Sequence, residues 1–294
     1  MISIFTPTFN RAELLSVLKN SIDAQVCTDF EWIIVDDGST DDTKKLATAW
    51  MEQKLPYRLK YIWQENQGKQ SAFNTAVKEA IGEWFICVDS DDHLTENAVN
   101  IMNIDINSIK DDCSGIVYPI DLKGSDKEKE WKQIDGKKVD IMDLKAIYGI
   151  PEAAILMRKS DIESLPFPQI KGEKFIPEGW LYQKLIAKGK FWAHNASFYI
   201  AEYQPDGMTK NVWNLWARNS TGVLEVLCEK YRLLDKYPLK KKIVEKTKCL
   251  ININTICMKA GKKCRDESPA PIFGYALMLP SYYFYKKRFG RKRK

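Results

Sequence analysis

Short apolar runs alternate with amphipathic segments over the first 122 residues. Runs with little polar interruption are typical of strands that are buried on both faces of a sheet. In the segments between them, apolar residues such as Leu14, Leu18 and Ile22 recur at helical spacing, which predicts amphipathic helices. We expect strands at residues 2–6, 32–35, 59–63, 84–88 and 115–122. This alternation predicts an α/β fold with a mostly parallel sheet, right-handed crossovers and helices on both faces.

Two of the predicted helices have candidate capping residues. Asn10 is a favoured N-cap residue, and Glu13 follows it three positions later, as in a capping box. Thr95 is the candidate cap for the helix that follows the fourth strand. We therefore expect Glu13 to serve only the start of its helix.

Polar residues gather directly after three of the predicted strands, at residues 6–8, 36–37 and 89–92. In open parallel sheets, ligands bind outside the carboxyl ends of the strands. The three clusters stand at such ends, so we expect them to contribute to one binding site.

The cluster at residues 89–92 holds three carboxylates, and neighbouring carboxylates repel one another unless a cation or hydrogen-bond donors compensate. Mg²⁺ and Mn²⁺ prefer one or two carboxylates together with phosphate oxygens and water. On one interpretation, Asp89 and Asp91 converge on such an ion, which neutralises a diphosphate leaving group. On the other, the residues form a solvated turn in which Asp92 or Thr95 caps the next helix.

The cluster after the second strand also has two interpretations. In the first, Asp36 or Asp37 accepts hydrogen bonds from a nucleobase or a ribose. In the second, Asp37, Gly38 and Ser39 form a turn and cap the following helix. The order and spacing of the clusters therefore carry more information than either cluster alone.

The composition is that of an ordinary globular protein, with 45% hydrophobic and 29% charged residues in a chain of 294. Seven cysteines without a Cys-x-x-Cys pair, several of them inside apolar runs, indicate reduced and buried thiols of a cytosolic protein. This usage argues against a disulfide framework and against a zinc site. We expect neither a signal peptide nor a membrane-spanning helix.

The net charge of +6 comes from the C-terminal end, since seven of the last nine residues are basic and the rest of the chain is nearly neutral. A nucleic-acid-binding domain would carry its basic patch on the folded surface, so we expect no nucleic-acid partner. The aromatic and aliphatic residues before the basic run match an interfacial anchor for an anionic membrane surface over residues 269–294. The alternative is a final helix that packs on the domain and has a solvated basic end.

The chain carries four linked motifs at compatible spacing, at residues 3–11, 35–41, 66–74 and 82–92. Together they resemble the inverting glycosyltransferases of family 2, which have the GT-A fold. The resemblance implies a Rossmann-like, mostly parallel sheet flanked by helices, and a hexosyl- or N-acetylhexosaminyl-transferase. Such an enzyme moves a sugar from a nucleoside diphosphate sugar, commonly a UDP-sugar, to an acceptor hydroxyl. The implied setting is bacterial surface polysaccharide or lipid-linked glycan synthesis, in the cytoplasm or on the inner face of the cell membrane.

The resemblance is strong over the first 110 residues and weak as far as residue 215, and it suggests how the chain is divided. We expect a GT-A domain over residues 1–215, in which residues 1–122 bind the nucleotide-sugar and residues 123–215 form the acceptor side. Few glycines and prolines interrupt residues 216–268, which predicts a helical extension before the tail at residues 269–294.

By position, the resemblance implies that the nucleotide-sugar is bound by Pro7, Thr8, Phe9, Asp37, Lys69, Asp89, Ser90 and Asp91. Asp37 would bind the base, and Lys69 the base or the phosphates. Asp91 would be the principal ligand of Mn²⁺ or Mg²⁺, with Asp89 as its partner. His194 has two interpretations, a third metal ligand or a structural histidine among aromatic residues.

An inverting transferase needs a general base that deprotonates the acceptor hydroxyl, and the resemblance implies an acidic residue at the head of a later helix. Glu178, which follows Pro177, is the best match, although Gly179 stands where relatives commonly have a second acidic residue. The alternative is that Glu178 only stabilises the N-terminus of its helix. Glu173 and Glu152 are the fallback candidates.

Two further expectations concern substrate contacts. Residues 203–210 resemble the segment that closes over the donor, where Thr209 or Lys210 would touch the diphosphate; the alternative is a plain surface loop. Trp180 is the candidate for stacking on an acceptor sugar, although most of the aromatic residues are expected in the core.

Two other classes of protein share parts of this pattern. A nucleotidyltransferase also joins a Rossmann-like sheet to a metal site, but it should carry a glycine-rich phosphate loop after the first strand. Residues 6–10 contain no glycine, which counts against this class. A non-catalytic nucleotide-sugar-binding or glycan-binding protein on the same fold would release no nucleoside diphosphate from a bound donor.

Overall fold

The computed structural model describes residues 1–109, 113–122, 127–202 and 211–290. Its contacts divide the chain into two compact units. The first unit consists of residues 1–167 and 184–204 and contains both β-sheets, and the second consists of residues 168–183 and 205–294 and is helical.

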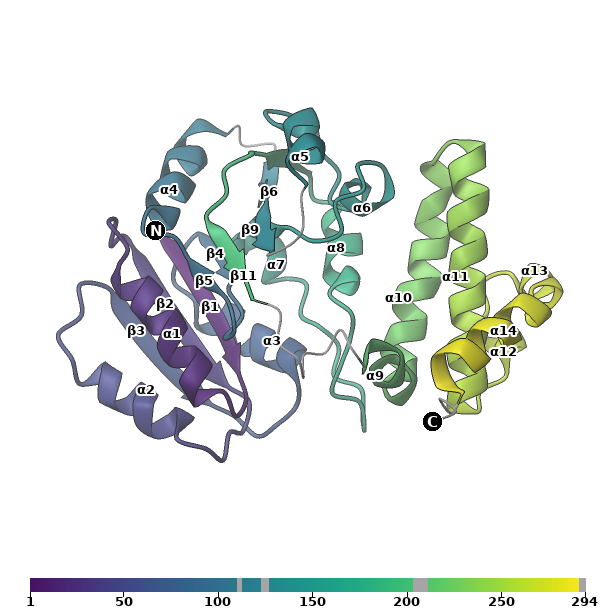
Figure 1. Ribbon diagram of the computed structural model, residues 1–294, viewed down its shortest axis with the longest axis horizontal. Coiled ribbons are helices and arrows are strands. Elements are labelled where there is room, and N and C mark those ends of the chain that lie inside the picture. Colours follow the sequence, from purple (N-terminus) through teal and green to yellow (C-terminus); the bar gives the residue numbers. More distant parts are fainter. Residues whose placement is uncertain (110–112, 123–126, 203–210, 291–294) are drawn as a thin grey trace. The chain divides into compact units, whose positions relative to one another are not determined.

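An eight-stranded sheet forms the centre of the first unit (Figure 1). β1 pairs in parallel with β2 and β4, and β2 pairs in parallel with β3, which confirms the arrangement expected for the first strands. β9 runs antiparallel between β4 and β6, so the sheet is mixed beyond β4. In spatial order the strands are β3 (Arg58–Trp63), β2 (Phe30–Asp36), β1 (Ile2–Thr8), β4 (Trp84–Cys87), β9 (Ala154–Arg158), β6 (Cys113–Tyr118), β10 (Lys190–Ala193) and β8 (Lys138–Val139).

Helices cover both faces of this sheet, as the apolar spacing predicted. On one face, Leu15 of α1 and Met102 of α4 are buried in the same core cluster as Ile4 of β1. On the opposite face, Phe73 of α3 meets Phe5 of β1 with ring centroids 5.9 Å apart, because successive residues of a strand point to opposite faces. The helices of this unit are α1 (Ala12–Asp23), α2 (Thr43–Met51), α3 (Lys69–Glu79), α4 (Ala98–Ser108), α5 (Glu128–Ile134), α6 (Asp143–Ala146) and α7 (Lys159–Ile162).

The strand predicted at residues 115–122 is two strands in different sheets. β6 ends before Pro119, and the chain continues as β7 (Ile120–Leu122) in a three-stranded sheet with β11 (Tyr199–Ala201) and β5 (His93–Leu94). Proline has no N–H to donate to a strand ladder, so it suits a position where the chain leaves one sheet for another.

The predicted capping box of the first helix is wrong. α1 begins at Ala12, and no side chain of the preceding residue caps it. Asn10 has a left-handed backbone with a φ of 52°, and its side-chain oxygen accepts a backbone N–H of the loop before α2 at 2.8 Å. Glu13 is exposed, and the Ala12 N–H donates to Asp41 at 3.1 Å instead. Thr95 likewise lies outside the N-cap position of α4. Contacts between loops therefore replace the predicted local caps.

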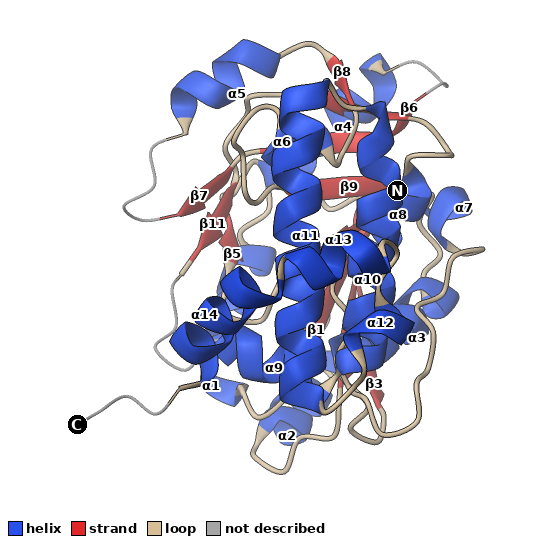
Figure 2. Ribbon diagram, turned by 90° about the vertical axis from the view of Figure 1, so that its right-hand side faces the viewer, coloured by secondary structure: helices blue, strands red, loops and turns tan. Residues whose placement is uncertain are grey.

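The second unit is built from helices (Figure 2). Val223 and Leu227 of α10 pack with Ile253 of α11 in its core, which confirms the predicted helical C-terminal part. No helix in the described part of the chain is long and apolar enough to cross a membrane. The helices are α8 (Gly179–Leu185), whose last two residues belong to the first unit, α9 (Val212–Arg218), α10 (Ser220–Leu233), α11 (Leu239–Ala260), α12 (Cys264–Glu267), α13 (Pro271–Ala276) and α14 (Met278–Phe289), with a 3₁₀ turn at Leu234–Lys236.

The boundary between the units differs from the division expected at residue 215. Residues 168–183 fold with the C-terminal helices. The Gln183 side chain donates to a carbonyl of α10 at 3.0 Å, and the Asn219 side chain accepts the Lys174 N–H at 2.8 Å. The segment that carries the predicted general base therefore belongs to the helical unit, and the functional division of the chain stays a prediction.

All seven cysteines are described, and none of them is in a disulfide bond. Cys113, Cys249 and Cys257 are buried, as the apolar surroundings of several cysteines in the sequence suggested. Burial raises the pKa of the Cys249 thiol to about 11, so this thiol stays protonated and unreactive at neutral pH.

Gly115→Ala will destabilise the central sheet. A Cβ at Gly115 would lie 2.3 Å from the carbonyl oxygen of Leu156 on β9 and 2.7 Å from the ring of Phe191 on β10. We expect urea titrations to show a loss of about 1–3 kcal/mol in the free energy of unfolding, the usual range for overpacking. Gly179→Ala is the control, because a Cβ there meets nothing closer than 3.5 Å. Equal effects of the two substitutions would contradict the prediction.

Candidate active site

The carboxyl ends of β1, β2 and β4 bring the three polar clusters to one edge of the central sheet. β1 lies between its two parallel neighbours, with Thr8 in register with Asp36 and Phe5 in register with Cys87. The Asp37 N–H donates to the Thr8 carbonyl at 2.9 Å. The chain order of the strands reverses at β1, and open α/β sheets bind ligands in the crevice beside such a reversal.

Two of the carboxylates after β4 are paired with cationic side chains. Arg11, just before α1, places Nη1 2.6 Å from Oδ2 of Asp91. Lys69, the first residue of α3, places Nζ 2.7 Å from Oδ1 of Asp89. All four side chains are partly buried, so these ion pairs offset the repulsion within the turn. Arg11 was not expected here, although it belongs to the motif at residues 3–11.

Tyr199 of β11 holds the acidic turn in shape, a role that its position in the sequence did not indicate. Its hydroxyl donates to Asp92 Oδ2 at 2.6 Å and accepts the Asp89 N–H at 3.1 Å. Burial raises the pKa of Asp92 to about 7; the charges of Asp89 and Asp91 act in the same direction, and the Tyr199 hydrogen bond opposes them. Burial also raises the pKa of Tyr199, so its hydroxyl stays protonated and available as a donor.

The Asp37 carboxylate closes the loop that precedes α3. It is buried and accepts the N–H groups of Gln67 at 2.9 Å and Gly68 at 2.7 Å, together with the Gln64 amide at 2.7 Å. These hydrogen bonds fix the residues immediately before Lys69, which reaches Asp89 from the start of α3. Asp37 therefore has a structural role, and its contact with the base stays a prediction.

The other predicted nucleotide ligands lie around the same edge. Thr8 is buried, and its hydroxyl has no hydrogen-bond partner within the described residues. A buried polar atom of this kind calls for an explanation such as an absent ligand or water. Ser90 is buried in the turn, Pro7 is partly buried in β1, and the Phe9 side chain is exposed directly after β1. Contacts between these residues and a nucleotide stay predictions.

Asp89 and Asp91 are the residues that would hold a divalent ion. Among the described residues, no group of three or more His, Cys, Asp or Glu side chains is arranged for a metal. The turn still fits Mn²⁺ or Mg²⁺, because these ions need only one or two carboxylates when a diphosphate and water supply the remaining oxygens. His194 follows β10, where its Nδ1 pairs with Asp105 of α4 at 2.6 Å, and this contact favours the structural interpretation.

The predicted general base precedes a helix, as expected. α8 starts at Gly179, and the exposed Glu178 carboxylate accepts the Tyr182 hydroxyl at 3.0 Å. The fallback candidate Glu173 caps α10, where it accepts two backbone N–H groups at 2.7 and 2.9 Å. Glu152 is exposed before β9. Glu173 therefore has a structural role, and Glu178 stays the leading prediction for the base.

The expected role of Trp180 in acceptor stacking is corrected by its surroundings. Trp180 is buried, and its Nε1–H donates to Glu225 of α10 at 3.1 Å, so its ring is not exposed for stacking. The segment at residues 203–210, with Thr209 and Lys210, lies outside the described residues.

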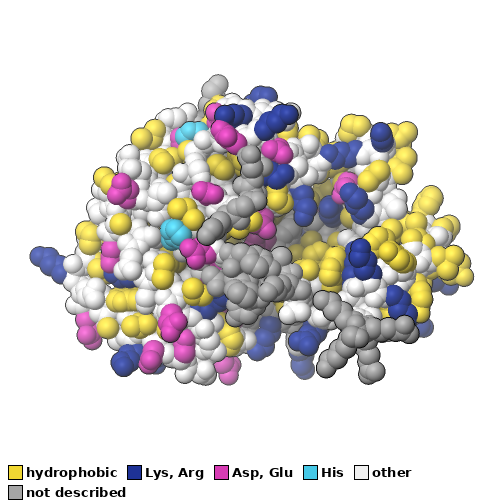
Figure 3. Space-filling view, viewed as in Figure 1, with side chains coloured by type: hydrophobic (Ala, Val, Ile, Leu, Met, Phe, Trp, Pro, Cys, Tyr) yellow, Lys and Arg dark blue, Asp and Glu magenta, His cyan; other side chains and the backbone are white. Residues whose placement is uncertain are grey.

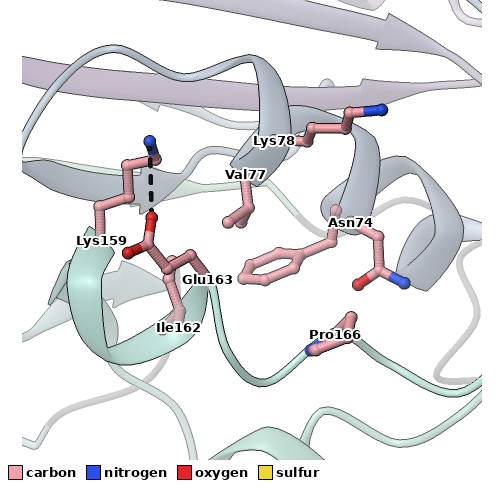
Figure 4. A pocket seen from close by; sticks show the side chains of 8 residues that line it. Asn74, Val77, Lys78, Lys159, Ile162, Glu163 and Pro166 are labelled. Atoms are coloured by element: carbon pink, nitrogen blue, oxygen red, sulfur yellow. Dashed lines mark ion pairs between the residues drawn. The ribbon is translucent and has the colours of Figure 1, made fainter.

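A cavity of about 530 Å³ lies between α3 and the segment that begins with α7 (Figure 4). Apolar and polar side chains both line it, and Lys159 and Glu163 form an ion pair of 3.8 Å at its side. The residues that line it are Phe73, Asn74, Val77, Lys78, Lys159, Ile162, Glu163 and Pro166. None of them is a predicted site residue, so the cavity does not coincide with the acidic edge.

Solved proteins share the mixed sheet with helices on both faces. TarS residues 1–349 from S. aureus match with a TM-score of 0.60 and 17% identity over 100% of this chain and 93% of that chain. The mannosyltransferase PcManGT from Pyrobaculum calidifontis matches with a TM-score of 0.59 and 17% identity over 98% of this chain and 83% of that chain. The fold is the GT-A fold, as the resemblance implied.

Sequence comparison identifies the family. The glycosyl transferase family 2 model matches residues 3–165, and the chain belongs to this family of glycosyltransferases. An uncharacterized glycosyltransferase of Nostoc sp. is 34% identical over 143 residues, which are 47% of this chain and 42% of that protein. The PGL/p-HBAD biosynthesis glycosyltransferase of Mycobacterium tuberculosis is 40% identical over 96 residues, 33% of this chain and 37% of that protein. The matched part spans less than half the length of each of these relatives.

Tyr199→Phe will loosen the acidic turn. The substitution removes the donor to Asp92 and the acceptor of the Asp89 N–H, both of them partly buried. We expect a loss of about 1–3 kcal/mol in the free energy of unfolding, measured by urea titration, because a half-buried carboxylate loses its side-chain donor and a backbone N–H loses its acceptor. Tyr275→Phe, at an exposed position of α13, is the control. If Tyr199→Phe were as stable as this control, the assigned role of the hydroxyl would be wrong.

Proposed function

We propose that this chain transfers a sugar from a nucleoside diphosphate sugar to an acceptor hydroxyl, with inversion at the anomeric carbon. The observation that carries the proposal is the carboxyl edge of the central sheet. There Asp91 pairs with Arg11 and Asp89 with Lys69, and β1 ends in Thr8, whose buried hydroxyl has no hydrogen-bond partner among the described residues. Carboxylates and cations at such an edge have the chemistry to hold a divalent ion together with a diphosphate.

Solved proteins of similar fold support this class of donor. TarS has been solved with UDP-GlcNAc, and PcManGT with GDP-Man and Mn²⁺. Glucosyl-3-phosphoglycerate synthase from M. tuberculosis has been solved with Mn²⁺, UDP-glucose and phosphoglyceric acid, and it matches this chain with a TM-score of 0.51 and 17% identity. We infer a UDP-sugar as donor, a hexose or N-acetylhexosamine as the transferred sugar, and a glycan or lipid-linked acceptor at the cytoplasmic face of the cell membrane.

Arg11 and Lys69 are proposed to have two successive sets of partners. In the protein alone they neutralise Asp91 and Asp89. A divalent ion held by these two carboxylates would stabilise the negative charge of the departing diphosphate. Arg11 and Lys69 would then exchange their carboxylate partners for phosphate oxygens, to which guanidinium and ammonium groups bind strongly. The charges at the edge are compensated in both states.

Glu178 is proposed to take the proton of the acceptor hydroxyl. As the proton moves to the carboxylate, the acceptor oxygen forms its bond to the anomeric carbon, and the bond from that carbon to the diphosphate breaks. Attack from the face opposite to the leaving group inverts the configuration. The Tyr182 hydroxyl, which donates to Glu178 at 3.0 Å, would hold the carboxylate in one orientation.

Asp91 and Arg11 form one ion pair, and substituting each of them will change metal binding in opposite directions. In calorimetric titrations, Asp91→Asn should weaken Mn²⁺-dependent UDP binding at least about tenfold, because a carboxylate ligand is lost. Arg11→Ala should bind Mn²⁺ alone about fivefold more tightly, since a partly exposed ion pair contributes up to about 1 kcal/mol. Arg58→Ala is the control, because Arg58 contacts Glu31 at the other end of these strands. If neither Asp91→Asn nor Arg11→Ala changed the affinity for Mn²⁺, the assignment of a metal site to Asp89 and Asp91 would be wrong.

Glu178→Gln will slow turnover and leave donor binding nearly unchanged. We expect UDP release from UDP-GlcNAc or UDP-glucose to slow at least about 100-fold, the typical contribution of a general base. UDP affinity in the presence of Mn²⁺ should stay within about twofold, because the proposed donor site uses other residues. Glu229→Gln, an exposed carboxylate on α10, is the matched control. Full turnover by Glu178→Gln would remove this residue from the mechanism.

A further inference from the structure

α13 and α14 present apolar side chains to solvent. Figure 3 shows hydrophobic side chains gathered over these two helices. The side chains are between 51% and 85% exposed, and clusters of exposed apolar residues on soluble proteins mark interaction surfaces. We use the term apolar patch for Ile272, Phe273, Tyr275, Leu279, Tyr282 and Tyr283.

The exposed residues of α14 lie on one face of the helix and pass from apolar to basic. They recur at spacings of three and four, in the order Leu279, Tyr282, Tyr283, Lys286 and Lys287. In sequence, four basic residues follow at positions 291–294, and no Asp or Glu occurs after Glu267. The apolar patch is therefore bordered by positive charge.

The opposite side of α14 faces the unit, where it carries the buried Ser281 and the partly buried Phe289, which packs against the core of the unit. Ser281 is fully buried, and its hydroxyl accepts the Asn254 amide of α11 at 3.2 Å; the same amide donates to the Gly274 carbonyl at 2.7 Å. Arg288 lies 3.5 Å over the Trp213 ring, so it is not part of the solvated basic run expected for the tail. Polar contacts together with Phe289 thus hold α14 to the unit, while the apolar patch faces solvent, which water disfavours.

We propose that α13 and α14 lie flat on an anionic lipid bilayer. The apolar patch would enter the headgroup region, and Lys286 and Lys287 would face the lipid phosphates. α14 has 12 residues and is about 18 Å long, too short for the hydrocarbon core of about 30 Å, so it lies along the surface. Tyrosine suits this depth because its ring is apolar and its hydroxyl is polar.

The charges favour a bilayer over a second copy of the chain. Two copies that met through the apolar patch would bring Lys286 and Lys287 of both chains to one interface, where like charges oppose association. An anionic surface attracts the same lysines. The proposal goes beyond the proposed function and does not depend on the identity of the donor or of the acceptor.

The full chain should sediment with vesicles of phosphatidylcholine and phosphatidylglycerol, and much less with phosphatidylcholine alone. The double variant Phe273→Glu with Leu279→Glu should bind the anionic vesicles at least about tenfold more weakly, because both exposed side chains become charged. Lys286→Gln and Lys287→Gln should each weaken binding about fivefold, and high salt should release the wild-type chain. Ile104→Glu, at an exposed apolar position of α4 in the first unit, is the matched control and should bind as the wild type does.

Two results would overturn the proposal. One is equal vesicle binding by the wild-type chain and the double variant. The other is a wild-type chain that does not bind vesicles but sediments as a dimer, with Leu279→Glu dissociating that dimer. This result would show that the apolar patch binds a second copy of the chain. Circular dichroism and the thermal shift with UDP and Mn²⁺ should be unchanged in every variant, so a failure here is distinguishable from a failure of the proposed function.

Discussion

Repulsion between carboxylates at the carboxyl edge of the central sheet is the constraint on which much of the first unit depends. Asp36 ends β2, Asp37 follows it, and three more carboxylates follow β4, all at the same edge. Each needs a partner, because uncompensated charges at a partly buried edge destabilise the fold. The partners come from different elements: Tyr61 of β3, Tyr199 of β11, the backbone before α3, and cations at the starts of α1 and α3.

The same constraint links stability to the proposed chemistry. Arg11 and Lys69 keep the acidic turn in a compensated state when nothing is bound, and a bound ion with a diphosphate would satisfy the same carboxylates and the same cations. Asp37 contributes indirectly to this charge compensation, because its hydrogen bonds hold the loop from which Lys69 reaches the acidic turn. A metal site of this kind needs few protein ligands, since the substrate supplies the remaining oxygens.

The second unit has a different organisation. Its core is formed by apolar contacts between α10 and α11, and α13 and α14 attach to it through Asn254, Ser281 and Arg288 together with the apolar ring of Phe289. The apolar patch on this helix pair stays exposed, and in the proposal Lys286 and Lys287 select an anionic lipid surface for it. Such a surface would bring an enzyme of the proposed kind close to an acceptor carried on lipid.

Apolar periodicity in the sequence was enough to place the four helices and the first four strands within the first 109 residues, because burial acts on neighbouring residues at fixed spacing. The same pattern placed Asp89 and Asp91 at a strand end, and the family motifs identified the enzyme class. Only the tertiary structure showed that Arg11 pairs with Asp91 and Tyr199 with Asp92, across 80 and 107 positions of sequence. It also replaced the local cap of α1 by Asp41. Such contacts depend on where separate elements meet in space, and no local pattern of residues specifies that.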